Sequence, residues 1–258
     1  MLSSELVAEI KRKKELRGLA DAVVLERLND YTKNNKIDLE KKSAKEIKLI
    51  IKEIRSELRL LVGRFQTGTK NKFSLLENND IETLLKTHTS TAERISLYPQ
   101  LKHLLTKLKV KSILDIGCGL NPLALASREV EYYASDINSQ ELEVIDKFFK
   151  KKKIKGKTSV LDLQNLKGPL PKTDVCLLFK VLDIIDPTHT LTESILQKIP
   201  SDKIIVSFST RKISGRKMNF PRRFWFEKLL QRMNYSFSTL KTENEFFYII
   251  DKSSSSKK

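Results

Sequence analysis

Two carboxylates and two glycines in the middle of the chain have the spacing of a nucleotide-like cofactor site. In Ser112-Ile-Leu-Asp-Ile-Gly-Cys-Gly-Leu-Asn-Pro122, an apolar run passes Asp115 and breaks into a turn containing Gly117 and Gly119. Glycine permits backbone angles and a closeness of approach that a Cβ atom would prevent. About twenty residues on, Glu131-Tyr-Tyr-Ala-Ser-Asp136 is a second apolar run ending in a carboxylate, suited to accept both hydroxyls of a ribose. The two segments predict a Rossmann-like cofactor site.

The glycine turn favours S-adenosylmethionine over a dinucleotide. A dinucleotide site has a third glycine, which packs the helix beside a pyrophosphate, but here Gly119 is followed by Leu120-Asn-Pro122. S-adenosylmethionine has no phosphate to hold. The alternative is a purely structural strand-to-helix turn, and the carboxylates of Asp115 and Asp136 at the two strand ends argue against it.

Two further predicted strand ends complete the outline of a methyl-donor pocket. In Leu161-Asp162-Leu163, the carboxylate could accept a hydrogen bond from the adenine amine while leucine covers the ring. A helix cap is the alternative role for Asp162. Phe179-Lys180 ends the next strand and would face the substrate.

The same strand end disfavours some target atoms. It has no Asn/Asp-Pro-Pro-aromatic loop, which many enzymes that methylate exocyclic amines carry, and Cys176 lies inside the strand, where it is badly placed to attack cytosine C5. A target that needs no deprotonation, such as guanine N7, fits better. Catalysis then requires desolvation, in-line positioning and management of the resulting positive charge.

A basic and aromatic segment at 209–225 is the candidate RNA contact. Six basic side chains would hold phosphates, and an aromatic ring could stack on a base pulled out of its helix. The basic residues are Arg211, Lys212, Arg216, Lys217, Arg222 and Arg223, among Phe220, Phe224 and Trp225. The alternative is that Phe224, Trp225 and Phe226 form the buried face of a helix. A lysine block at 147–157 is expected to form a solvated helix end and loop that adds long-range attraction.

One further candidate lies upstream of the predicted sheet. Ser90 or Thr91 could cap a helix that carries Arg94 in its first turn, where the guanidinium could pair with the amino-acid carboxylate of the cofactor. From physics alone, a surface arginine is the alternative.

The elements that must position these residues form two regions. Residues 1–109 predict an all-helical module, with helical patterns at Leu16–Leu28, Ala44–Val62, Ile81–Leu85 and Leu97–Leu108, and turns at Asn29–Lys36 and Gly63–Lys72. Residues 110–252 alternate short strands with helices, which is typical of a parallel α/β sheet. Strands are expected near 111–116, 131–135, 157–161, 174–179, 203–208, 235–240 and 245–250, the last two joined by the hairpin Thr242-Glu-Asn-Glu245. We expect residues 253–258 to be a disordered tail.

Composition restricts the partners. The net charge of +17, from 49 Lys and Arg against 32 Asp and Glu, favours a polyanion. Nucleic acid is preferred to membrane because no apolar run approaches the roughly 18 residues that span a bilayer. A solvated lysine-rich surface is the alternative. Two cysteines, Cys118 and Cys176, make neither a disulfide framework nor a zinc site, so we expect no metal. The lack of a signal peptide predicts a cytoplasmic protein.

Four motifs together resemble one enzyme family. They are His88-Thr-Ser-Thr-Ala-Glu-Arg94, Asp115-Ile-Gly-Cys-Gly-Leu-Asn-Pro122, Phe179-Lys180 and Ser207-Phe-Ser-Thr-Arg-Lys-Ile-Ser-Gly-Arg216. In order and spacing they are similar to the Arm/Rmt-type 16S rRNA (guanine-1405 N7) methyltransferases of aminoglycoside producers and resistant bacteria. The similarity extends from about residue 45 to 250.

The resemblance implies a fold and a set of roles. The fold is α/β, a class I S-adenosylmethionine-dependent methyltransferase with a Rossmann-like seven-stranded sheet and an N-terminal helical module that docks on the assembled small ribosomal subunit. Lys180, Arg211 and Arg216 would serve the RNA or target base. The expected cofactor-binding residues are Arg94, Asp115, Gly117, Gly119, Asp136, Ile137, Asp162, Leu163 and Phe179.

The chain departs from the family pattern at several positions. The usual arginine after Ser-Thr is Ala92, the Phe-Pro-Thr loop is Phe208-Ser-Thr210, and the proline and glutamate after Phe-Lys are Asp183 and Asp186. We expect a monomeric S-adenosylmethionine-dependent rRNA methyltransferase acting at guanine N7, and these loop departures favour the alternative of another RNA target. The alternatives are methylation of another RNA, such as tRNA, and a non-catalytic RNA-binding or ribosome-assembly protein with this fold.

Overall fold

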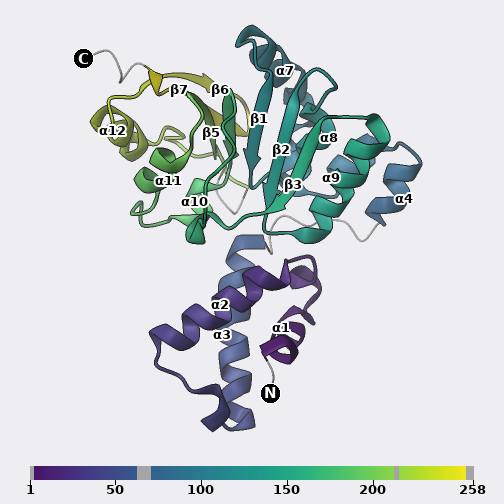
Figure 1. Ribbon diagram of the computed structural model, residues 1–258. Coiled ribbons are helices and arrows are strands. Elements are labelled where there is room, and N and C mark those ends of the chain that lie inside the picture. Colours follow the sequence, from purple (N-terminus) through teal and green to yellow (C-terminus); the bar gives the residue numbers. More distant parts are fainter. Residues whose placement is uncertain (1–2, 63–70, 212–214, 254–258) are drawn as a thin grey trace.

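A seven-stranded sheet forms the centre of the larger part of the molecule (Figure 1). The computed structural model describes residues 3–62, 71–211 and 215–253. The strand order is β3-β2-β1-β4-β5-β7-β6, with β7 antiparallel to both of its neighbours. The strands are β1 (Ser112–Ile116), β2 (Glu131–Asp136), β3 (Gly156–Val160), β4 (Val175–Phe179), β5 (Lys203–Ser209), β6 (Ser236–Lys241) and β7 (Glu245–Asp251). The predicted strands, hairpin and class I methyltransferase fold are confirmed.

Apolar side chains on both faces of the sheet explain why helices cover both sides. Adjacent residues of a strand point to opposite faces, so Ile113 and Leu114 of β1 belong to different hydrophobic clusters. Every residue of β4 is buried, as expected of a central parallel strand. The helices of this half are α8 (Pro122–Leu125), α9 (Ser139–Lys152), α10 (Leu182–Ile185), α11 (Thr192–Lys198) and α12 (Phe224–Arg232), with the 3-10 helix η4 (Leu163–Asn165).

The first helices form a separate core beneath the sheet (Figure 1). The helix predicted over Ala44–Val62 is confirmed with the same bounds as α3, and its apolar stripe includes the fully buried Ile54 and Leu58. Its start is fixed by a reciprocal cap, in which Glu46 N donates to Ser43 Oγ and Ser43 N donates to Glu46 Oε2. The other elements are α1 (Ser3–Lys11), η1 (Lys14–Leu16), α2 (Asp21–Asn34) and η2 (Leu39–Lys41).

The next helices pack on the sheet rather than on the first group. They are α4 (Lys72–Glu77), α5 (Ile81–Lys86), α6 (Thr89–Arg94), η3 (Ile95–Leu97) and α7 (Tyr98–Lys107). Leu84 and Leu101 share a hydrophobic cluster with Ile113 of β1. The domain boundary at residue 109 stays a prediction, and these clusters favour a boundary between α3 and α4.

Some local predictions differ from the structure. The turn predicted at Asn29–Lys36 is wrong, because α2 continues to Asn34 with these polar residues on its partly solvated side. The helix predicted over Leu16–Leu28 is interrupted, since an extended segment at 18–20 separates η1 from α2. Most of the predicted turn at Gly63–Lys72 and of the tail at 253–258 lies outside the described residues. No helix in the described ranges is long and apolar enough to cross a membrane.

Candidate functional site

A pocket lies at the carboxyl ends of β1, β2 and β4, the edge where open α/β sheets bind ligands. It holds about 850 Å³ of space, part of it open to solvent. The loops that follow β1, β2, β3 and β4 line it, together with α6 and the end of α3. The predicted residues that line it are Arg94, Gly117, Asp136, Ile137, Asp162, Leu163, Phe179 and Lys180. The structure thus brings together eight residues that are far apart in the sequence.

The turn after β1 requires glycine at two positions. Gly117 has a φ of +65° and Gly119 a φ of +49°, which side-chain-bearing residues rarely adopt. A Cβ atom on Gly117 would lie 2.6 Å from Val181 Cγ2, which also lines the pocket. A Cβ on Gly119 would lie 2.9 Å from the His88 ring. Gly119 itself does not line the pocket, but Val181 and His88 both do. The absence of a Cβ atom at Gly117 and Gly119 therefore leaves room for these two side chains in the pocket wall.

Asp136 ends β2 with its carboxylate fixed by backbone groups. One oxygen accepts from Gly119 N at 2.9 Å and the other from Asn138 N at 2.9 Å. Burial, reinforced by the nearby Glu141 carboxylate, raises the pKa of Asp136 to about 6. Each oxygen keeps a lone pair for a further donor. The carboxylate is thus held in a fixed orientation at the pocket, and its contact with ribose hydroxyls stays a prediction.

Asp115 has a different environment from Asp136. It lies beneath the turn and does not line the pocket. Its Oδ2 accepts from Tyr132 Oη at 2.6 Å, whereas its Oδ1 has no hydrogen-bond partner in the described part of the chain. Burial raises the pKa of Asp115 to about 7. Direct cofactor contact by Asp115 stays a prediction, and the geometry favours a supporting position under the turn.

The predicted adenine end of the pocket lies at η4. Leu161 and Leu163 line it with apolar surface. Asp162 caps η4, since its Oδ1 accepts from Gln164 N at 2.9 Å, so the cap that sequence offered as an alternative is present. Its Oδ2 pairs with Arg27 of α2. The contact with adenine therefore stays a prediction for a carboxylate that already has two partners.

Arg94 is not a surface residue. It is the last residue of α6, not part of its first turn, because His88 and not Ser90 or Thr91 precedes the helix. The side chain is 1% exposed and its guanidinium lies 4.9 Å from the centroid of the Phe179 ring. Within the described residues, its guanidinium donates to Glu245 and Asn121 and also lines the pocket, so contact with a ligand carboxylate stays a prediction.

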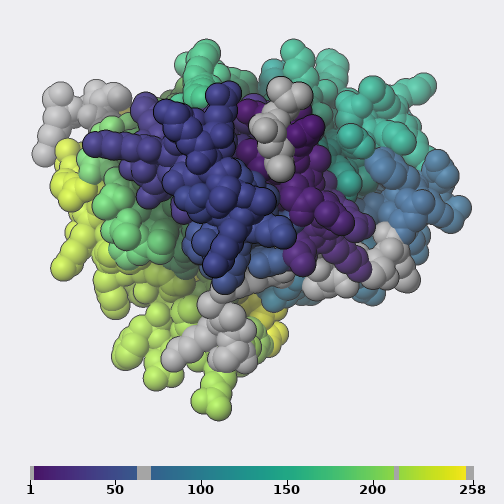
Figure 2. All heavy atoms as spheres, turned by 90° about the horizontal axis from the view of Figure 1, so that it is seen from below, coloured from purple at the N-terminus to yellow at the C-terminus, as the bar shows by residue number. Residues whose placement is uncertain are grey.

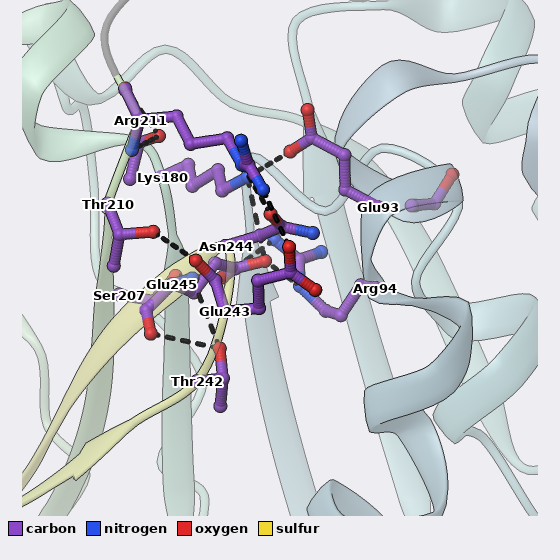
Figure 3. Close-up of polar contacts among 12 residues, drawn as sticks. Glu93, Arg94, Lys180, Ser207, Thr210, Arg211, Thr242, Glu243, Asn244 and Glu245 are labelled. Atoms are coloured by element: carbon purple, nitrogen blue, oxygen red, sulfur yellow. Dashed lines mark hydrogen bonds and ion pairs between the residues drawn. The ribbon is translucent and has the colours of Figure 1, made fainter. Parts of the chain in front are cut away.

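Glu245, at the start of β7, is a functional candidate that sequence reasoning missed. Arg94 Nε donates to its Oε1 at 2.8 Å and Arg94 Nη2 to its Oε2 at 3.1 Å. Ser207 Oγ donates to Oε2 at 2.6 Å, and Lys180 Nζ lies 3.7 Å from Oε1 (Figure 3). This 1% exposed carboxylate therefore compensates the charges of the arginine and the lysine at the pocket. Only tertiary contact between residues 151 positions apart reveals it.

Lys180 has a strained backbone at the end of β4. Its φ of +57° is unusual for a residue with a side chain and is typical of functional sites. Its ammonium group pairs with Glu93 of α6 (Figure 3). The side chain is only 10% exposed, so Lys180 is held at the pocket wall by two carboxylates.

Arg211 and Arg216 do not line the pocket. Arg211 is held by the β6–β7 hairpin, with Nε donating to Asn244 Oδ1 at 2.8 Å and Nη2 to Glu243 Oε1 at 2.6 Å (Figure 3). Arg216 is exposed. The buried-face alternative holds for Phe226 but not for Phe224, which is 58% exposed; Phe220 is 78% exposed, and base stacking by an aromatic ring stays a prediction. Trp225 stacks on His189 with 3.7 Å between ring centroids.

Other predicted features have structural explanations. Cys118 and Cys176 are buried and unpaired, and burial raises the pKa of each thiol. No cluster of possible metal ligands occurs within the described ranges. In the lysine block, Lys151 Nζ donates to the carbonyl oxygens of Leu76 and Glu77, so it secures the end of α4 rather than being fully solvated.

Comparisons with known proteins agree with this geometry. A family model described as ribosomal RNA methyltransferase (FmrO) matches residues 40–249. Two proteins named 16S rRNA (guanine(1405)-N(7))-methyltransferase, from Frankia casuarinae and Serratia marcescens, are 26% identical over 182 residues and 28% identical over 187 residues. The alignments cover 66% and 70% of this chain and 63% and 74% of those proteins.

A solved structure extends the similarity to the whole chain. The structure of the 16S rRNA methylase RmtB is 25% identical, with a TM-score of 0.78, and the match covers 98% of this chain and 99% of that one. The N-terminal helices are therefore included in the similarity.

Proposed function

The chain belongs to the ribosomal RNA methyltransferase (FmrO) family, and from this membership and its pocket we propose that it methylates guanine N7 in 16S rRNA, using S-adenosylmethionine. The substrate is the assembled small ribosomal subunit, and the protein acts as a monomer in the cytoplasm. The observation that supports this proposal most strongly is the pocket, in which Asp136, Gly117 of the glycine turn, Leu161 and Leu163 lie together.

The residues of the pocket fit this cofactor. Asp136 would accept the ribose hydroxyls, the guanidinium of Arg94 would bind the amino-acid carboxylate, and Ile137 with Leu163 would contact the adenine. The glycine turn leaves the space in which a Cβ atom would meet Val181. When bound, S-adenosylmethionine supplies an electrophilic methyl group at neutral pH.

The chain's own residues supply position and charge rather than a general base. Guanine N7 has a lone pair at neutral pH, so no proton has to be removed before methylation. Lys180, fixed by Glu93 and Glu245, would orient the target base at the pocket wall. The buried carboxylate of Glu245 would also moderate the positive charge that the base acquires.

The RNA-binding surface would extend over the face that carries the pocket. Figure 2 views the molecule from the side of the first helices, which cover the middle of the view, with the segment near residue 220 projecting at its edge. Exposed Lys45, Lys48 and Lys52 of α3 and exposed Arg216 and Lys217 are suited to bind phosphates. Exposed Phe220 is available for stacking on a base.

The test incubates the purified protein and labelled S-adenosylmethionine with intact 30S subunits, naked 16S rRNA and bulk tRNA in parallel. Borohydride and aniline cleavage then maps any N7-methylguanine. We expect label in the decoding region of the 30S subunit. Label confined to tRNA would support guanine-N7 methylation but refute the 30S subunit as the substrate. Cofactor binding without any label would contradict the proposed reaction.

A second RNA target is favoured by one observation. Asp183, where the family has proline, pairs with Arg223 of the basic segment, with 2.7 Å between Oδ2 and Nη2. This contact joins the loop after β4 to the predicted RNA-binding segment, so the two could position a different nucleotide from that of the relatives. The tRNA arm of the same experiment tests this alternative.

A further inference from the structure

The first helices contact the loops that would hold the cofactor. The extended segment at 18–20 lies against the loop after β2, and Leu19 forms an antiparallel bridge with Asn138. Ala20 N donates to Ile137 O at 2.9 Å, and Ser139 Oγ donates to Gly18 O at 3.2 Å. These contacts begin one residue after Asp136. The N-terminal region is therefore hydrogen-bonded directly to the loop that carries the ribose-binding carboxylate.

A second contact joins the same region to the adenine end of the pocket. Arg27 of α2 has a side chain only 10% exposed, and its Nη2 donates to Asp162 Oδ2 and, at 2.7 Å, to Gln164 Oε1. Gln164 Nε2 in turn donates at 2.7 Å to the carbonyl oxygen of Ile185, which lines the pocket. Arg27 thus fixes η4 and, through Gln164, the end of α10.

A third contact is apolar. Leu61 and Val62, at the end of α3, line the pocket beside residues of the loops after β2 and β3. Figure 1 shows α3 ending just beneath the carboxyl edge of the sheet. One wall of the pocket therefore belongs to the N-terminal helices and not to the sheet.

We propose that Arg27 is a positioning residue for the cofactor, and that the region of α1–α3 couples cofactor binding to docking on the RNA substrate. The inference rests on the proposed function in taking S-adenosylmethionine as the cofactor and the 30S subunit as the substrate. Arg27 acts through Asp162 and Gln164 and does not touch the reacting atoms. Because coupling between two binding sites is reciprocal, cofactor binding strengthens docking by the factor by which docking strengthens cofactor binding.

The primary experiment replaces Arg27 by Met in the full-length protein. Methionine keeps an unbranched side chain of comparable length but has no donors, so Asp162 and Gln164 lose their link to α2. We expect the Kd for S-adenosylmethionine in calorimetry to rise about tenfold, which corresponds to about 1.4 kcal/mol. In the methylation assay, the KM for S-adenosylmethionine should rise while kcat at saturating cofactor stays near the wild-type value.

Arg55→Met is the matched control. Arg55 lies in the same helical region, is 16% exposed, and donates to the carbonyl oxygens of Glu9 and Ile10, so its loss weakens that region without touching the pocket. Arg27→Lys, which keeps a donor and the charge, should partly restore the affinity for the cofactor. If Arg27→Met does not fold, the Kd of Arg27→Lys for S-adenosylmethionine is compared with those of the wild type and Arg55→Met instead.

The outcomes separate this inference from the proposed function. Failure of the wild-type protein to bind S-adenosylmethionine would refute the proposed function itself. Equal cofactor affinities for wild type, Arg27→Met and Arg55→Met, or equal losses in both variants, would overturn the positioning role. A further readout is 30S binding with and without S-adenosylhomocysteine. The cofactor product should strengthen wild-type binding more than binding by Arg27→Met, and an identical gain in both would refute the coupling.

Discussion

At the scale of residues, the carboxylates of Asp115 and Asp136, on neighbouring strands, lie in different environments. Asp136 faces the pocket with both oxygens held by backbone N–H groups, whereas Asp115 is enclosed under the turn with one oxygen unpartnered among the described residues. Burial raises the pKa of both. Both titrations therefore make folding stability depend on pH, and the titration of Asp136 is also expected to affect cofactor affinity because Asp136 lines the pocket.

The affinity for S-adenosylmethionine is expected to fall as the pH falls through about 6. Below this pKa, Asp136 is protonated and loses acceptor capacity for the ribose hydroxyls. Asp136→Asn should weaken binding about 10- to 100-fold at pH 7.5 and should remove the pH dependence between 5 and 7. Calorimetry across this pH range, with circular dichroism as a check on folding, measures both effects. A pH-independent wild-type affinity would contradict the assignment.

Asp115→Asn is expected to stabilise the cofactor-free protein above pH 7. The folded-state pKa of Asp115 is about 7, above its ordinary value of 3.8. The stability that protonated Asp115 contributes is therefore fully present below about pH 4. That contribution is lost as the pH rises through 7. Asparagine stays uncharged and still offers an oxygen to Tyr132. Urea denaturation measures the free energy of unfolding at pH 5 and pH 8. This free energy should fall less between the two pH values for Asp115→Asn than for the wild type. An equal fall in both proteins would exclude Asp115 as its cause.

At the scale of elements, each turn at the carboxyl edge has a specific shape requirement. The turn from β1 to α8 uses positive φ at two glycines, and the loop after β4 uses it at Lys180. These turns lie at one edge of the sheet because β1, β2, β3, β4 and β5 run parallel. The strands thus determine where the loops of the pocket meet, while α3 and α6 complete its wall.

Gly117→Ala tests the shape of the first turn. Its Cβ atom would adopt an unfavourable φ and lie 2.6 Å from Val181 Cγ2, so we expect at least tenfold weaker cofactor binding. The backbone strain costs about 1 kcal/mol of folding free energy. Gly168→Ala is the control, because Gly168 has a φ of +76° but no atom within 4 Å of the added Cβ. The control should lose stability and keep affinity; equal losses of affinity would disprove a pocket-specific effect.

At the scale of the whole molecule, the charge of +17 is carried by a protein in which the end of α3 lines the pocket and the first helices cover the middle of one face (Figure 2). Many basic side chains are internally paired, such as Arg223 with Asp183 and Arg211 with Glu243. The net positive charge attracts RNA at long range. Because many basic side chains are already paired, exposed ones such as Arg216 are those available to bind phosphates.

Binding to 30S subunits is expected to weaken steeply with salt. Arg216→Ala should lower the slope of log K against log salt concentration by roughly 0.7 to 0.9, the contribution of one phosphate contact. Arg128→Ala is the control, because exposed Arg128 precedes β2 and lies at the opposite edge of the sheet. Filter binding at several salt concentrations measures the slopes. An unchanged slope for Arg216→Ala would place Arg216 outside the interface.

The sequence by itself determined the fold and the centre of the site. Strand periodicity, the glycine turn and the carboxylate of Asp136 are local features, because each depends on residues close together in the chain. Tertiary structure alone decided which charges lie together. Glu245 reaches Arg94, and Arg27 reaches Asp162, across more than a hundred residues, and no local pattern encodes those contacts. The physical reason is that a buried charged side chain is stable only beside a partner of opposite charge. Which partner lies beside it is decided by how elements distant in the sequence pack together.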